Sequence, residues 1–116
     1  MPDETQTFLE KFKGDIDKMR QAAPDMLKGF GGLFLNVMKD GALQRKQKEL
    51  VAVGIALAQR CEPCIRLHVQ KCLEAGNSPA EIIEAASVAV VMQGGPAYTY
   101  FPIVLETLES LASKPS

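Results

Sequence analysis

The sequence has no tryptophan, a single histidine and few aromatic residues. It lacks any apolar run long enough to span a bilayer. Neither sign of charge is in excess, because 13 basic and 14 acidic side chains leave a net charge of −1. The first residues, Met1 to Thr5, are acidic and polar, unlike a secretory signal. We therefore expect a cytoplasmic protein with no nucleic-acid partner and no membrane partner.

Cysteine is also scarce. The chain has three cysteines, and two of them, Cys61 and Cys64, form a C-x-x-C motif. Without an export signal, this usage favours redox or metal chemistry over a framework of structural disulfides. The length of 116 residues, with 47% apolar and 23% charged residues, is typical of one globular domain. We expect a single domain over residues 1–116.

Apolar residues recur at helical spacing, and no stretch alternates as a half-buried strand would. The pattern predicts helices over about residues 8–19, 26–38, 43–60, 61–76, 78–92 and 97–112. Ser78-Pro79-Ala80-Glu81 is typical of a capping box. The second segment contains Gly29, Gly31 and Gly32, so either close packing supports a helix there or the helix breaks. The last helix is expected to bury Phe101, Val104, Leu105, Leu108 and Leu111. The fold class is all-α, with about six helices.

The segment Ile82–Met92 is apolar on nearly every side beyond its first turn. Such a helix is usually enclosed on all faces. Either the five other helices surround it, or a second subunit covers it. Because a domain of this size has little room for a fully enclosed helix, the pattern favours self-association.

Four chemically reactive side chains share the predicted helix 61–76, namely Cys61, Cys64, His68 and Cys72. Residues three and four apart lie on one helix face. Cys61 and Cys64 can therefore form a disulfide without large backbone movement. The start of a helix stabilises a thiolate, and His68 can accept a thiol proton or stabilise the thiolate as imidazolium. The arrangement indicates a dithiol redox centre.

Other interpretations remain open. Four ligands along one helix cannot surround zinc within one chain, so a metal site is not favoured. Haem attachment would need a histidine directly after Cys64, where the chain has Ile65. Cys72 fits a buried structural thiol, and His68 could be a hydrogen-bonded core residue. Glu49 lies on the neighbouring predicted helix, which should run antiparallel, and is as compatible with an exposed position as with a buried partner of His68.

The spacing Glu49-x11-Cys61-x2-Cys64-x3-His68 resembles the signature of AhpD-like alkylhydroperoxidases in the carboxymuconolactone decarboxylase superfamily. The resemblance covers about residues 42–109, through Glu74-Ala75-Gly76 to Gly94-Gly95-Pro96-Ala97. It implies an all-helical subunit that assembles into homo-trimers or homo-hexamers. The decarboxylase branch generally lacks the paired cysteines, so Cys61 and Cys64 argue against lactone decarboxylation.

The resemblance also implies a thiol-dependent peroxidase that reduces hydroperoxides without a cofactor or metal. Cys64 would attack the peroxide, Cys61 would resolve it as a disulfide, and His68 and Glu49 would relay the proton. A dithiol donor, either a lipoyl-type or a thioredoxin-like protein, would regenerate the pair. Some members carry a second histidine where this chain has Pro63. The alternatives are a general disulfide reductase and a non-enzymatic oligomeric helical module whose cysteines sense redox state or bind metal.

Overall fold

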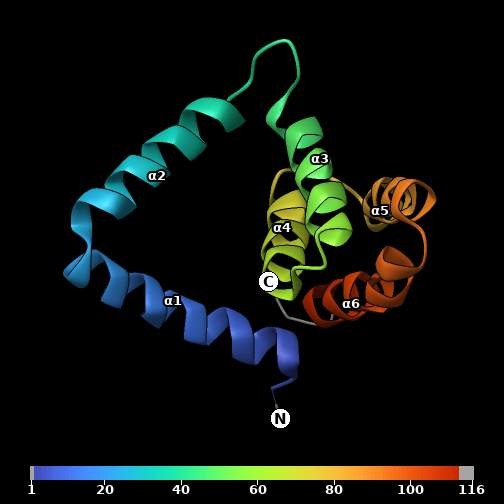
Figure 1. Cartoon of the computed structure of the whole chain (residues 1–116), viewed down its shortest axis with the longest axis horizontal. Helices are drawn as coiled ribbons and strands as arrows, with labels where there is room; N and C mark the ends of the chain where they lie inside the picture. The colour runs from blue at the N-terminus through green and yellow to red at the C-terminus, as the bar shows by residue number, and fades with distance from the viewer. Residues whose placement is uncertain (1, 113–116) are drawn as a thin grey trace.

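The computed structural model describes residues 2–112, and within this range the chain forms helices and no strand (Figure 1). The all-α prediction is confirmed. The elements are α1 Glu4–Ala22, α2 Pro24–Met38, α3 Arg45–Ala58, α4 Glu62–Glu74, α5 Pro79–Gln93 and α6 Gly95–Ala112. None of the helices within residues 2–112 is both long and apolar enough to cross a bilayer.

The helix boundaries follow local sequence signals. Ser78 caps α5, since its Oγ accepts a hydrogen bond from the Glu81 N–H (3.1 Å) and its own N–H donates to Glu81 Oε1 (2.8 Å). This confirms the predicted capping box. Proline stands in the first turn of α2, α4 and α5, where its missing N–H has no intrahelical partner to lose.

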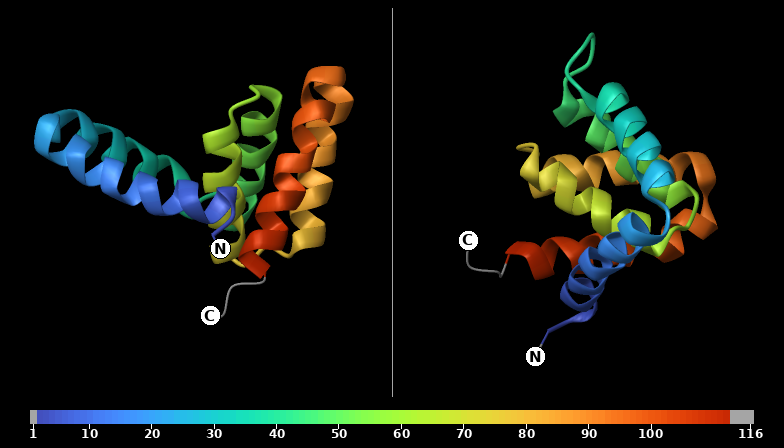
Figure 2. Two further views of the ribbon diagram at one scale, coloured as in Figure 1. Left: turned by 90° about the horizontal axis from the view of Figure 1, so that it is seen from below. Right: turned by 90° about the vertical axis from the view of Figure 1, so that its left-hand side faces the viewer.

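Helices α3 to α6 pack together into what we call the body (Figures 1 and 2). The body contains nearly all of the buried apolar side chains, which are Val53, Ala56, Leu57, Ile65, Val69, Cys72, Ile82, Ala86, Ala89, Ala97, Val104 and Leu108. Fully burying one large aliphatic side chain of this kind contributes about 1.5–3 kcal/mol. The body therefore has its own hydrophobic core.

Helices α1 and α2 project from the body as a two-helix unit, which we call the arm (Figure 2). Helix α2 is continuous, yet none of its residues is buried. A Cβ atom added at Gly29, Gly31 or Gly32 would meet no atom within 4 Å outside the adjoining backbone of its own helix. The expectation that this segment needs close packing or breaks is therefore wrong for the isolated chain, because the helix persists with its glycines in open space.

One expectation about burial fails in the single chain, and the structure removes one of the two alternatives for α5. Leu105 is 44% exposed, although α6 does bury Val104 and Leu108. Helix α5 leaves Val88, Val91 and Met92 exposed, with Val91 at 82%. The other five helices therefore do not enclose α5, and burial of this surface by another subunit stays a prediction.

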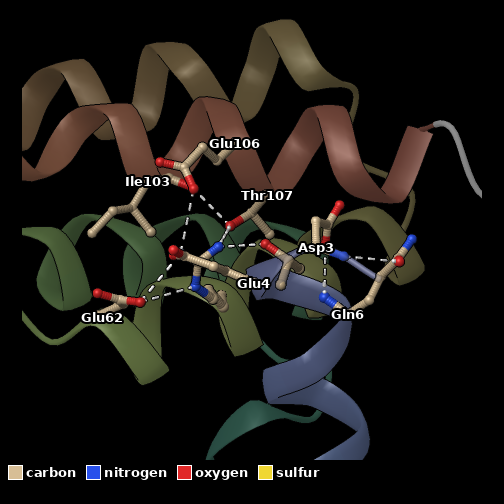
Figure 3. Close-up of polar contacts among 9 residues, drawn as sticks. Asp3, Glu4, Gln6, Glu62, Ile103, Glu106 and Thr107 are labelled. Carbon is tan, nitrogen blue, oxygen red and sulfur yellow. Dashed lines mark hydrogen bonds and ion pairs between the residues drawn. The ribbon is translucent and has the colours of Figure 1, made fainter. Parts of the chain in front are cut away.

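A buried arginine attaches the arm to the body. Arg66 of α4 is only 2% exposed, and its guanidinium lies 3.2 Å from Glu62 and 3.3 Å from Glu4 of α1. It also donates to the hydroxyls of Thr5 and Thr107, which are both buried. Figure 3 shows Glu4, Glu62 and Glu106 converging from three different helices. This polar cluster fixes the start of α1 between α4 and α6.

Candidate functional site

The turn between α3 and α4 places the cysteine pair at the start of α4. Helix α3 ends in a Schellman motif, in which the Arg60 N–H donates to the Leu57 carbonyl (3.0 Å) and the Cys61 N–H donates to the Ala56 carbonyl (3.1 Å). Arg60 has the left-handed φ of 56° that this motif requires. The chain therefore reverses within three residues, so α3 and α4 run antiparallel, as predicted.

Cys61 and Cys64 are joined by a disulfide, with their Cα atoms 5.2 Å apart. Cys61 is the N-cap of α4, and its sulfur accepts a hydrogen bond from the Cys64 N–H (3.3 Å). The expectation that helix α4 includes Cys61 is thus off by one residue. Both cysteines are half-buried. The pair lies where the free N–H groups and the dipole of α4 stabilise negative charge on sulfur.

His68 lies one helical turn beyond Cys64 and contacts Glu49 across the α3–α4 interface. The His68 Nδ1 atom is 2.9 Å from Glu49 Oε1. Glu49 is completely buried, and among the described residues its Oε2 atom has no hydrogen-bond partner. Of the two positions that the sequence allowed for Glu49, exposed or buried beside His68, the structure has the buried one. A buried carboxylate with an unsatisfied oxygen lowers stability and is more often found at functional sites than in ordinary cores.

Cys72 lies one turn further along α4 and is fully buried as a free thiol. Burial raises its pKa to about 12, and the nearby charge of Glu49 acts in the same direction. A thiol with such a pKa is protonated and unreactive at neutral pH. The structure thus places Cys72 in the core, apart from the disulfide pair.

Two residues near the site were missed from the sequence: Phe34, which lies beside His68, and Lys71, which contacts Phe34. The ring of Phe34 in α2 lies 6.1 Å from the His68 ring, measured between centroids. The ammonium of Lys71 lies 5.2 Å from the centre of the Phe34 ring. The spacing of three residues between His68 and Lys71 could have indicated a shared helix face. No local signal relates Phe34 to either, because the contact joins segments far apart in the chain.

Residues 2–112 contain no group of three or more His, Cys, Asp or Glu side chains that could hold a metal ion. The site that the structure brings together therefore consists of the Cys61–Cys64 disulfide and the His68–Glu49 pair. It combines a reducible disulfide with an imidazole that is hydrogen-bonded to a buried carboxyl group.

A profile of the carboxymuconolactone decarboxylase family matches residues 24–106. This chain belongs to that family. The match begins at Pro24 and so includes α2, whereas the motif-based resemblance was traced from about residue 42. Helix α2 is therefore part of the family's common sequence, together with the body.

Solved structures of carboxymuconolactone decarboxylase family proteins have the same fold. A Legionella pneumophila member is 32% identical, with a TM-score of 0.91 over 96% of this chain and 99% of that one. A Thermotoga maritima member, for which a role in the antioxidative response has been suggested, is 29% identical. Its TM-score is 0.80, over 91% of this chain and 90% of that one.

Among curated sequences, protein 4 in the cox locus of Paracoccus denitrificans, which is uncharacterised, is 30% identical over 103 residues. The similarity covers 89% of this chain and 93% of that protein. The family takes its name from a decarboxylase, so membership alone does not fix the reaction. The reaction has to be inferred from the side chains of the site.

Proposed function

We propose that the protein is a thiol-dependent peroxidase that reduces hydroperoxides through the Cys61–Cys64 pair. The observation that carries this proposal is the position of the disulfide at the start of α4, one turn from the His68–Glu49 pair. Peroxide reduction by thiols needs a stabilised thiolate, a second thiol within bonding distance and a proton donor. The antioxidative role suggested for the Thermotoga maritima relative supports the same class of reaction.

In the proposed reaction, the Cys64 thiolate attacks one oxygen of the hydroperoxide. The O–O bond breaks, the alcohol leaves after taking a proton, and Cys64 becomes a sulfenic acid. The Cys61 sulfur then attacks Cys64, the S–O bond breaks, and water leaves. Two thiols have lost two electrons, the peroxide has gained them, and the product is the disulfide present in the structure.

His68 and Glu49 are assigned to proton transfer. With an ionised Glu49 as acceptor, Nδ1 of His68 carries the proton, and Nε2 is left to accept one from the Cys64 thiol. The protonated ring can then supply a proton to the leaving alcohol. Pro63 occupies the position of a second histidine in some relatives, so this chain relies on His68 alone.

The disulfide must be reduced before a second turnover. We assign this step to an external dithiol, carried by a lipoyl-type or thioredoxin-like protein. Two sulfurs on the donor become a disulfide while Cys61 and Cys64 return to thiols, so the electron count balances. A cytoplasmic location would provide such donors and keep the pair reduced.

A peroxidase assay tests the proposal. Purified protein should consume hydrogen peroxide or an organic hydroperoxide when dithiothreitol or dihydrolipoamide is supplied. Oxidation of the dithiol with a small disulfide as substrate, but with no peroxide consumption, would instead identify a disulfide reductase. If the purified protein contains bound metal and consumes neither peroxide nor disulfide, the alternative of a non-enzymatic helical module with metal-binding cysteines would be favoured.

Two matched variants identify the attacking sulfur. Cys64→Ser should abolish peroxide consumption. Cys61→Ser should leave one stoichiometric turnover and a sulfenic acid on Cys64 that a dimedone-type reagent traps. The reverse result would give the attacking role to Cys61. Peptide mapping after mild oxidation should find only the Cys61–Cys64 link.

We further propose that the protein forms a homo-trimer or homo-hexamer. Exposed apolar side chains occur on two faces, with Val51 and Ile55 of α3 beside Val88 and Met92 of α5 along one groove, and others along α2. A soluble chain rarely leaves so much apolar surface in water, and closed symmetry covers it in every copy. Light scattering at micromolar concentration should give a mass several times 12.6 kDa. A monodisperse monomer would contradict the proposal.

A further inference from the structure

Helix α2 meets the site at one point. None of its residues is buried, yet the half-buried Phe34 lies against His68 with ring centroids 6.1 Å apart and an interplanar angle of 38°. Two other helices therefore contact His68: Glu49 of α3 lies within hydrogen-bond distance of Nδ1, and Phe34 of α2 lies beside the imidazole ring. Its side chain is 20% exposed.

The Phe34 ring is itself held in place. The Lys71 ammonium lies 5.2 Å from its centre, within the range of a cation–π interaction, and the Phe30 ring lies 6.4 Å away. The end of α2 is also fixed to α3, because Lys48 Nζ donates to the carbonyl oxygens of Val37 and Lys39, each at 2.7 Å. Lys48 directly precedes Glu49. The same turn of α3 thus anchors α2 and supplies the carboxylate.

We propose that Phe34 is a positioning residue for His68, an inference that rests on the proton-transfer role proposed above. One hydrogen bond at Nδ1 fixes one edge of an imidazole but leaves the ring free to rock about that bond. A neighbouring ring blocks this motion and keeps water from that side of the imidazole. Small displacements of a reacting group lower rates steeply, so a fixed ring keeps Nε2 in a productive position.

The single histidine of the chain makes this testable without enzyme activity. In ¹H–¹⁵N long-range NMR spectra, every imidazole signal belongs to His68. Phe34→Ala should shift the His68 ring protons, through loss of the Phe34 ring current, and should lower the share of the Nδ1–H tautomer. Phe34→Tyr keeps the aromatic ring and should restore both signals. Phe8→Ala is the matched control, because Phe8 is half-buried in the same arm and stacks on Phe12, away from His68.

A chemical readout complements the spectra. In a Cys61→Ser background, the rate at which iodoacetamide alkylates Cys64 at pH 7 reports thiolate formation. Phe34→Ala should slow this reaction roughly tenfold or more, Phe34→Tyr should restore it, and Phe8→Ala should leave it unchanged. If Phe34→Ala does not fold, Phe34→Leu keeps apolar volume while removing the ring, and the same two measurements apply.

The outcomes separate the two proposals. Altered His68 spectra and slower alkylation in Phe34→Ala, both restored by Phe34→Tyr, support the positioning role. Spectra and rates equal to those of Phe8→Ala overturn it. A wild-type protein that consumes no peroxide overturns the peroxidase proposal, while the NMR comparison still decides whether Phe34 positions the ring.

Discussion

The body and the arm bury their side chains very differently. Helices α3 to α6 share a continuous apolar core, whereas α1 buries only Thr5 and Leu9 and α2 buries nothing. The two parts nevertheless have similar apolar spacing in the sequence. Apolar residues at helical spacing therefore predict which face of a helix is apolar, but not whether that face is covered within the same chain.

The reactive groups follow the same division. The cysteine pair, His68 and Glu49 all belong to the body or to the turn that enters α4. The arm contributes only Phe34 to this neighbourhood. Under the proposed function, the packed body holds the reacting groups, while the arm presents exposed apolar side chains and places the Phe34 ring beside His68. Five measurements test this division.

The largest effect is expected in the body, at the His68–Glu49 pair. Glu49→Gln and His68→Ala should each lower the peroxidase rate by roughly 100-fold or more, because proton transfer by a positioned side chain contributes about that much. Both variants should also raise the pH at which Cys64 ionises, measured by alkylation. Circular dichroism should show an intact fold. Unchanged kinetics in both variants would remove the proton relay and confine the reaction to the cysteine pair.

The second effect concerns the arm's exposed face. Leu35 of α2 is 71% exposed, and Leu35→Glu should lower the mass found by light scattering roughly threefold or more if a second copy covers it. Asn36→Glu adds the same charge at the neighbouring exposed position and should preserve the assembly. Val91→Glu on α5 should behave as Leu35→Glu does. Equal masses for all variants would mean that the arm projects into solvent.

The attachment of the arm gives a third, smaller effect. Arg66→Met leaves the buried Thr5 and Thr107 hydroxyls without their charged partner, which should lower the free energy of unfolding by about 1–3 kcal/mol. Amide exchange should accelerate most in the first turns of α1. Arg20→Met removes an exposed ion pair with Asp17 and should change stability by less than about 1 kcal/mol. Uniform acceleration across all helices would show that Arg66 supports the body instead.

Cys72 tests how completely the core of the body excludes water. Its pKa is raised from 9.0 to about 12, mainly by burial, so the folded state keeps a proton that the unfolded state loses. The stabilisation is complete below pH 9 and declines as pH rises from 9 toward 12. Between pH 8 and pH 10, wild type should lose about 1 kcal/mol more of its unfolding free energy than Cys72→Ala. If the unfolding free energies of wild type and Cys72→Ala, measured by urea titration, change in parallel with pH, the Cys72 thiol is not shielded from water.

The smallest effect is expected at the turn that leads into the site. Arg60 adopts a left-handed φ, which costs a non-glycine residue about 1–2 kcal/mol. The equivalent position after α4 is Gly76, with φ of 101°. Arg60→Gly should therefore raise the unfolding free energy by about 0.5–1 kcal/mol, after allowing for the greater freedom of glycine in the unfolded chain. A loss of stability in urea titrations would mean that the Arg60 side chain contributes more than its backbone strain.

Much of the molecule could be predicted from the sequence because the relevant signals are local. Proline positions, the Ser78 capping box and Gly76 mark the boundaries of the helices through backbone chemistry within a few residues. The spacing places Cys61 at the start of one helix and Cys64 and His68 within it, so the closeness of the two cysteines and the imidazole follows from helical geometry.

Only the tertiary structure decided which candidates meet. Glu49 was equally compatible with an exposed and a buried position, because the face of α3 that turns inward depends on how α4 packs against it. Arg66 finds its partners 61 and 41 residues away, and Phe34 reaches His68 from a separate helix. Helical periodicity determines which residues share a face, but the packing of one helix against another determines what each face touches.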